Sequence, residues 1–100
     1  MTKIRAVIKY PDCNPVVMLI DRTPEAIDRQ VGGMPKAISF GEDLYAFVNG
    51  KADRFQIEPN VRYLGKQIYG PVVFTARTPH GVDCLSEDQA EQIRQMIKKK

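Results

Sequence analysis

The residues best suited to recognising a ligand lie close together in one stretch of the chain: Asn60, Arg62, Tyr63, Lys66 and Tyr69. Arginine can hold a phosphate group through two parallel hydrogen bonds, and lysine adds a mobile positive charge. Asparagine both donates and accepts hydrogen bonds, and a tyrosine ring can stack on a base. We therefore predict that these five residues bind an anionic, phosphate-bearing small molecule. A structural alternative is that Arg62 forms an ion pair with Glu58 and that the tyrosines simply pack.

The sequence offers no group of residues typical of catalysis. A nucleophilic serine or cysteine needs a base, and the one histidine, His80, falls in a segment rich in turn formers. Two pairs of adjacent carboxylates, at 42–43 and 87–88, are explained by a hairpin turn and by the first turn of a helix, where acidic residues favour the helix dipole. We expect a protein that is not an enzyme and has no catalytic residues.

The two cysteines, Cys13 and Cys84, are far apart in the sequence and belong to no CxxC pair. Zinc sites need several such ligands at short spacing, so the sequence predicts no metal site and no cofactor. We expect both thiols to be reduced and to be buried or half-buried. No apolar run approaches the ~20 residues of a membrane span, and no signal-peptide pattern is visible, so we expect a cytoplasmic protein without a membrane partner.

Charge argues against nucleic acid as the partner. The chain of 100 residues carries 15 Lys and Arg against 12 Asp and Glu, a net charge of +3, and residues 98–100 alone are three lysines. Trp is absent as well, so we do not expect nucleic-acid binding. A second group of cations, Lys3, Arg5 and Lys9, forms a stripe on one face of the first expected strand. Such charge is typical of an edge strand that must not pair with other chains, and this interpretation needs no ligand.

Periodicity and turn residues define the elements that must position these side chains. Residues 3–10 alternate between apolar and polar and predict a strand with one solvent-facing side, whereas the unbroken apolar run 16–20 predicts a more central strand. Thr23 and Pro24 predict the start of a helix that ends at Gly32-Gly33. Residues 37–40 and 44–48 predict a second hairpin, which ends in a tight, positive-φ turn at 49–50.

Beyond residue 50 the pattern weakens. Residues 51–66 predict an ordered loop packed by Phe55, Ile57 and Leu64, followed by a long strand 67–76 with a bulge or edge at 70–71 and a turn over 77–83. Ser86 predicts the N-cap of a last helix with one buried face, made of Ala90, Ile93, Met96 and Ile97. The order ββαββ-loop-β-α predicts a single α+β domain over residues 1–100, with a mainly antiparallel sheet of about five strands and helices covering one face.

Several short segments follow one another in a characteristic order: Thr23-Pro24-Glu25-Ala26, Val31-Gly32-Gly33, residues 43–51, Pro59-Asn60-Val61-Arg62, residues 68–73 and residues 85–89. In these segments the chain resembles, nearly end to end, a family of small phage and mobile-element proteins catalogued only as a domain of unknown function. The chain departs from the usual Pro-Asn-Arg of that family by placing Val61 before Arg62. The resemblance implies a small fold and a mobile-element setting, and it brings no catalytic residues.

That setting, together with the positive charge around Arg62, leads to a functional prediction. We expect a non-catalytic binding protein of a phage or mobile element that sequesters an anionic nucleotide-derived defence signal in the cytoplasm of the bacterial host. The alternative is an inhibitor or adaptor that binds a host protein through an exposed strand or helix face. In either case we expect a homodimer or higher homo-oligomer, because symmetric association can enlarge the site of a small domain.

Overall fold

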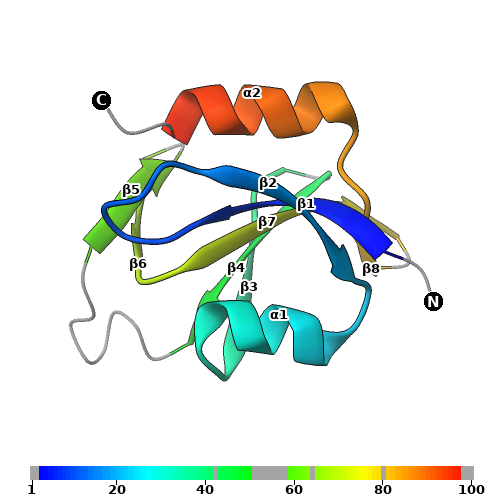
Figure 1. Cartoon of the computed structure of the whole chain (residues 1–100), viewed down its shortest axis with the longest axis horizontal. Helices are drawn as coiled ribbons and strands as arrows, with labels where there is room; N and C mark the ends of the chain where they lie inside the picture. The colour runs from blue at the N-terminus through cyan, green and yellow to red at the C-terminus, as the bar shows by residue number, and fades with distance from the viewer. Residues whose placement is uncertain (1–2, 42, 51–58, 64, 80, 98–100) are drawn as a thin grey trace.

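A computed structural model of the chain describes residues 3–41, 43–50, 59–63, 65–79 and 81–97. Within these residues the elements are β1 (Lys3–Lys9), β2 (Val16–Asp21), α1 (Pro24–Val31), β3 (Pro35–Ser39), β4 (Leu44–Asn49), β5 (Pro59–Tyr63), β6 (Lys66–Tyr69), β7 (Val72–Thr78), β8 (Gly81–Asp83) and α2 (Glu87–Ile97). Six strands form one antiparallel sheet in the order β2-β1-β7-β4-β3, with β8 paired to β7, while β5 and β6 form a separate two-stranded sheet (Figure 1). The predicted α+β class and the antiparallel sheet are confirmed.

The sheet is buried on both faces, and each face has its own helix. Phe74 of the central strand β7 belongs to a core cluster with Ile93 of α2, whereas its neighbour Val73 belongs to a second cluster with Ile27 of α1. The two helices accordingly lie on opposite sides of the sheet (Figure 1). The expectation that both helices cover one face is wrong, because an amphipathic stripe shows which side of a helix is buried but not which face of the sheet receives it.

Helix α1 begins and ends as its sequence predicts. The Thr23 hydroxyl accepts a hydrogen bond from the Ala26 N–H at 3.2 Å, and Pro24 occupies the first helical position, where no N–H is needed. At the other end Gly32 adopts φ 82°, and its N–H donates to the Asp28 carbonyl. This left-handed cap favours glycine and terminates the helix.

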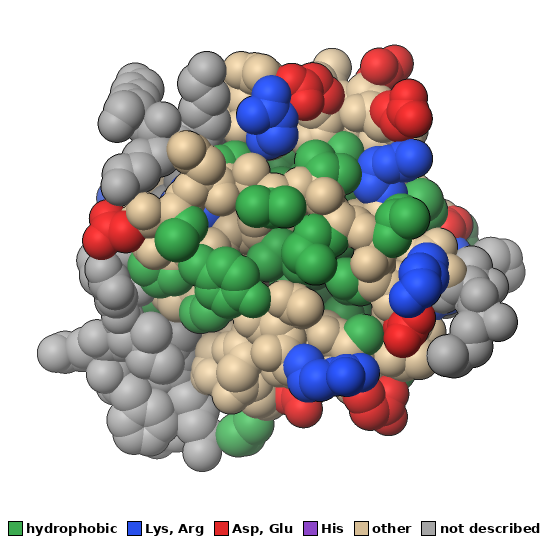
Figure 2. All heavy atoms as spheres, in the orientation of Figure 1, with side chains coloured by type: hydrophobic (Ala, Val, Ile, Leu, Met, Phe, Trp, Pro, Cys, Tyr) green, Lys and Arg blue, Asp and Glu red, His purple; other side chains and the backbone are tan. Residues whose placement is uncertain are grey.

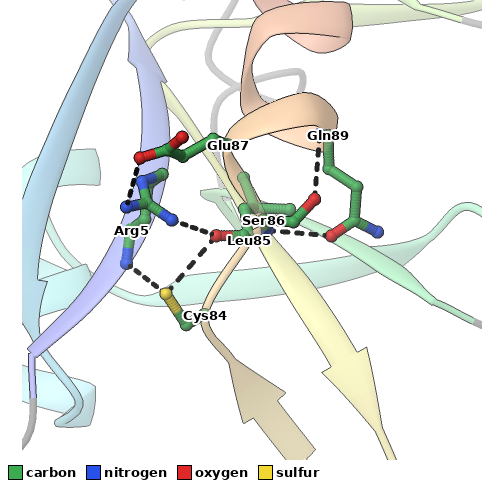
Figure 3. A network of polar contacts seen from close by, with 6 residues as sticks. All are labelled: Arg5, Cys84, Leu85, Ser86, Glu87 and Gln89. Carbon is green, nitrogen blue, oxygen red and sulfur yellow. Dashed lines mark hydrogen bonds and ion pairs between the residues drawn. The ribbon is translucent and has the colours of Figure 1, made fainter.

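Helix α2 begins with a reciprocal capping box at Ser86 (Figure 3). The Ser86 hydroxyl accepts a hydrogen bond from the Gln89 N–H at 3.0 Å, and the Gln89 side-chain oxygen accepts one from the Ser86 N–H, also at 3.0 Å. Leu85 just before the cap is buried in the same cluster as Ala90, as predicted. Met96 is 58% exposed, so its predicted burial is wrong: it lies at the margin of the apolar stripe.

The first two strands exchange the positions that their sequences predict. β1, expected at an edge, lies between β2 and β7, and β2, expected to be central, is an edge of the sheet. Ile4, Ala6 and Ile8 of β1 are buried, whereas Val16 to Leu19 of β2 are exposed. An apolar run forms a buried strand only when other strands pair with both of its edges. The second partner of β1 is β7, which is more than sixty residues away along the chain, so the local sequence does not show that β1 is interior.

The segment between 59 and 83 also differs from expectation. Residues 59–63 form β5 rather than a loop, and the predicted strand 67–76 is divided at Gly70, with φ 71°, into β6 and β7 of different sheets. Part of the expected turn over 77–83 is the short strand β8. Phe55, Ile57 and Leu64, which were expected to pack the loop, lie outside the described residues, as do Glu42, Glu58, His80 and residues 98–100.

Candidate functional site

A cleft of about 360 Å³ lies where the hairpin of β3 and β4 meets β6. Among the described residues its lining combines two lysines, two side-chain amides, one phenol, three aliphatic residues and two glycines: Lys36, Lys66, Asn49, Gln67, Tyr69, Ile38, Val48, Ile68, Gly50 and Gly65. Val48 and Ile68 are buried, while both lysines are exposed. The cleft therefore combines apolar surface with cationic and polar groups.

Among the described residues, the charged groups that line the cleft are all positive. Lys36 of β3 and Lys66 of β6 both belong to the lining, and none of the described lining residues carries a carboxylate. Ammonium groups that share a concave surface attract anions more strongly than isolated surface lysines, because low-dielectric walls focus the field. Such a cleft suits a negatively charged ligand.

The amides of the cleft are held by the backbone around them. The Asn49 Nδ2 donates to the carbonyls of Val31 and Gly32 at 3.3 and 3.4 Å, which ties the end of β4 to the end of α1. The Gln67 Nε2 donates to the Ile68 carbonyl at 3.1 Å. These hydrogen bonds limit the orientations of both side chains, so a ligand would meet polar groups that are already ordered.

Gly50 lines the cleft, and its glycine is needed for a reason other than the predicted positive-φ turn. Its backbone does not have the positive φ that a tight Asn-Gly turn would require. Its N–H instead donates to the Met34 carbonyl at 2.8 Å, and a Cβ at this position would lie 2.9 Å from that carbonyl oxygen. Glycine is therefore needed here because the backbone of residue 34 approaches closely.

The five residues predicted to bind a ligand are divided by the structure. Lys66 and Tyr69 line the cleft. Arg62 is exposed and lies opposite Gln67 in the pairing of β5 with β6, so it projects from the same face of the hairpin as a lining residue. Asn60 and Tyr63 are not among the residues that line the cleft.

Asn60 holds strands together. Its Nδ2 donates to the carbonyls of Lys9 and Gly70, both at 2.8 Å, and its Oδ1 accepts a hydrogen bond from the Lys9 ammonium at 2.6 Å. Lys9 is only 5% exposed, so this contact satisfies a buried charge. The side chain of Asn60 thus joins β1, β5 and the junction between β6 and β7.

Tyr63 belongs to the core. Its ring is 6% exposed and packs between Phe40 and Phe74, with both ring centroids 5.0 Å away. Burial, and secondarily the charge of Asp43, raises the pKa of the Tyr63 phenol above its usual value. A ring enclosed in this way is not available to stack on a ligand.

The basic stripe of β1 is engaged within the molecule. Lys3 forms an ion pair with Asp21 at 2.9 Å, and the Arg5 guanidinium donates to the Leu85 carbonyl at 2.9 Å and lies 3.7 Å from the Glu87 carboxylate (Figure 3). The Arg5 side chain therefore anchors the start of α2. The stripe does not protect a sheet edge, because β1 has a strand on each side.

Both cysteines are free and exposed, which corrects the expectation of buried or half-buried thiols. The Cys84 sulfur nevertheless accepts a hydrogen bond from the Arg5 N–H at 3.1 Å and donates to the Leu85 carbonyl at 3.4 Å (Figure 3). Among the described residues, no group of three or more His, Cys, Asp or Glu is placed to hold a metal ion, and neither helix is long and apolar enough to span a membrane.

Sequence reasoning missed Lys36, Asn49 and Gln67. Lys36 and Lys66 are thirty positions apart and belong to different sheets, so no local pattern connects them. Comparison with family models, with curated proteins and with solved structures found no match to this chain.

Proposed function

We propose that this chain is a non-catalytic binding protein whose cleft between the β3–β4 hairpin and β6 holds an anionic, phosphate-bearing small molecule. The observation that supports the proposal most directly is the composition of the lining, where Lys36 and Lys66 are the charged residues in the part of the chain that the structure describes. Arg62 at the adjacent strand position would add a guanidinium for bidentate contact with phosphate.

The remaining groups of the cleft suit a nucleotide-derived ligand. Ile38, Val48 and Ile68 offer an apolar surface, and Tyr69 offers a ring on which a base can stack. Sequestration of such a ligand needs no acid, base or nucleophile, and in a phage or mobile element it would remove a nucleotide-derived defence signal from the host.

Calorimetric titration tests the proposal. The parent protein is titrated with a panel of cyclic nucleotides, ADP-ribose-type nucleotides and inorganic phosphate, with the uncharged nucleosides as a comparison. We expect binding of at least one phosphate-bearing compound and none of the nucleosides. Replacing Lys36 and Lys66 together by alanine should weaken that binding at least tenfold, because each charge-assisted contact is typically worth about 1.5 to 3 kcal/mol.

A matched control separates the cleft from overall charge. The double variant Arg29→Ala/Arg94→Ala also removes two positive charges, but from the two helices and outside the cleft. It should bind as the parent does. All variants should melt within a degree or so of the parent, because Lys36, Lys66 and Arg29 are exposed and an i,i+3 surface ion pair such as that of Arg94 with Glu91 contributes little to folding. Equal losses in both double variants, or no binding by the parent across the panel, would contradict the proposal and favour the protein-binding alternative.

A further inference from the structure

The outer edge of β2 exposes apolar side chains on both of its faces. Val16, Val17, Met18 and Leu19 are 52, 40, 40 and 59% exposed, although the strand forms a full ladder with β1. Figure 2 shows apolar side chains gathered across the middle of the side that carries β2 in Figure 1, with charged side chains around them. An apolar centre inside a polar rim is the usual anatomy of a protein interface.

The opposite edge of the sheet is protected and β2 is not. β3 begins with a proline and has an exposed lysine, Lys36, at its second position. Proline and lysine are common means of preventing a sheet edge from pairing with another chain. Between Val16 and Ile20, β2 carries no charge, no proline and no glycine. Nothing in this segment therefore prevents the edge from pairing with a strand of another chain.

The backbone of β2 also points hydrogen-bonding groups outward. The Arg5 N–H donates to the Cys84 sulfur, and the Arg5 carbonyl accepts from the Leu85 N–H at 3.0 Å, so both groups face away from β2. Arg5 lies opposite Leu19, and the direction of these groups alternates along an antiparallel pair. It follows that Leu19, and Val17 two residues earlier, turn their N–H and C=O groups toward the open side.

We propose that β2 pairs antiparallel with β2 of a second copy of this chain, across a two-fold axis at Met18. In this register Val17 lies opposite Leu19 of the second copy, and each such pair exchanges two backbone hydrogen bonds. Val16 lies opposite Ile20 of the second copy, and Met18 lies opposite Met18 of the second copy. Residues 16–20, which pair across the axis, are all apolar, and the sheets of the two copies become continuous.

Neighbouring registers are less favourable. An axis at Val17 would place Leu19 opposite Pro15, which has no N–H to donate. An axis at Leu19 would place the Asp21 carboxylate opposite Val17. With the axis at Met18, Asp21 stays at the end of the paired segment, where it keeps its ion pair with Lys3 at 2.9 Å.

The helices complete the interface. Both α1 and α2 contact β2, from opposite faces of the sheet. A two-fold axis normal to the sheet brings each helix beside its counterpart in the second copy. Stable interfaces bury roughly 800 Å² of each partner, more than a single strand supplies, so the helix flanks are part of the proposed contact. The anion-binding cleft lies at the other edge of the sheet and stays open, so the dimer does not depend on the proposed function.

Light scattering after size exclusion measures the oligomeric state of the full chain. We expect twice the 11.3 kDa of one chain for the parent. Leu19→Glu should convert it to a monomer that stays folded, since glutamate is exposed there and lies opposite Arg5. Val17→Pro should do the same, because it removes an outward N–H that β1 does not use. The control Met96→Lys should remain dimeric, because Met96 is as exposed as Leu19 but lies on the side of α2 that is next to Leu44 and Tyr63, away from β2.

Cross-linking tests the register. In a Cys13→Ser/Cys84→Ser background, Met18→Cys places two thiols at a non-hydrogen-bonded pair, whose Cα spacing of about 4.5 Å permits a disulfide. Mild oxidation should give a covalent dimer on a non-reducing gel. Val16→Cys, which faces Ile20 of the second copy, should not cross-link. A parent that stays monomeric up to its solubility limit, or a dimer that survives both Leu19→Glu and Val17→Pro, would overturn the proposal.

Discussion

Lys9 and Asn60 form a polar contact between the two sheets. The Lys9 ammonium is buried and is held by the Asn60 Oδ1 at 2.6 Å and by the Tyr10 carbonyl at 3.3 Å. A buried charge without such partners is strongly destabilising. The amide that the sequence suggested for ligand binding is therefore needed within the fold.

Replacing Asn60 by alanine should lower the free energy of unfolding by about 2 to 3 kcal/mol, because it removes an acceptor from a buried ammonium and two donors from backbone carbonyls. Denaturation in urea measures the change. Arg62→Ala, two positions along the same strand and exposed, should alter it by no more than about 0.5 kcal/mol. Similar effects of the two changes would mean that the contact of Asn60 with Lys9 contributes little.

Among the elements, α2 depends on a strong local signal and on one long-range anchor. The capping box between Ser86 and Gln89 satisfies N–H groups at the start of the helix. Arg5 of β1 reaches the same end from a distant part of the chain, through the Leu85 carbonyl. The cap determines where the helix begins, and the anchor holds that end beside β1.

Ser86→Ala should reduce the free energy of unfolding by about 1 kcal/mol, since the hydroxyl that accepts from the Gln89 N–H is lost. Thermal unfolding followed by circular dichroism detects this loss. Gln92→Ala serves as the control, because it is an exposed position inside the same helix, where alanine is well tolerated. If both variants melt alike, the cap does not stabilise α2 in the way that its geometry suggests.

In the molecule as a whole, the two edges of the sheet differ in charge and exposure. The β3 edge lies beside the cationic cleft, while the β2 edge presents an apolar strand with open hydrogen-bonding groups. Between them, the core beneath α2 encloses Tyr63, Phe40 and Phe74. The core thus contains one ionisable ring whose charge state should affect the stability of the fold.

Alkaline pH should destabilise the protein through Tyr63. Because burial raises the pKa of its phenol above the ordinary value of about 10.0, the folded state holds the proton more tightly than the unfolded state. The resulting stability is fully present below pH 10 and is lost as the pH rises through the raised pKa. Ultraviolet absorbance should show a tyrosine that ionises late.

That late step should disappear in Tyr63→Phe and persist in Tyr10→Phe, since Tyr10 is 43% exposed. The phenylalanine variant should also lose less stability than the parent between neutral and alkaline pH. An unchanged titration in Tyr63→Phe would assign the late step to another residue.

Much of the local structure could be predicted from the sequence, because its causes lie within a few residues. Thr23 and Pro24 start α1, Gly32 ends it, and Ser86 starts α2, each through contacts with positions three or four residues away. The density of short apolar segments and turns was sufficient to predict an α+β fold with an antiparallel sheet.

Tertiary structure alone decided which of these elements became neighbours. The pairing of β1 with β7 made β1 interior and left the apolar β2 at an edge. A run of valine, methionine and leucine occurs in both edge and central strands, so the local sequence does not distinguish the two positions. In the same way, Lys36 and Lys66 line one cleft, whereas Asn60 hydrogen-bonds to Lys9 and Gly70 and Tyr63 packs in the core, although the latter two lie closer to Lys66 in sequence. Local preferences determine the secondary structure of a segment, but long-range strand pairing determines which residues each side chain contacts.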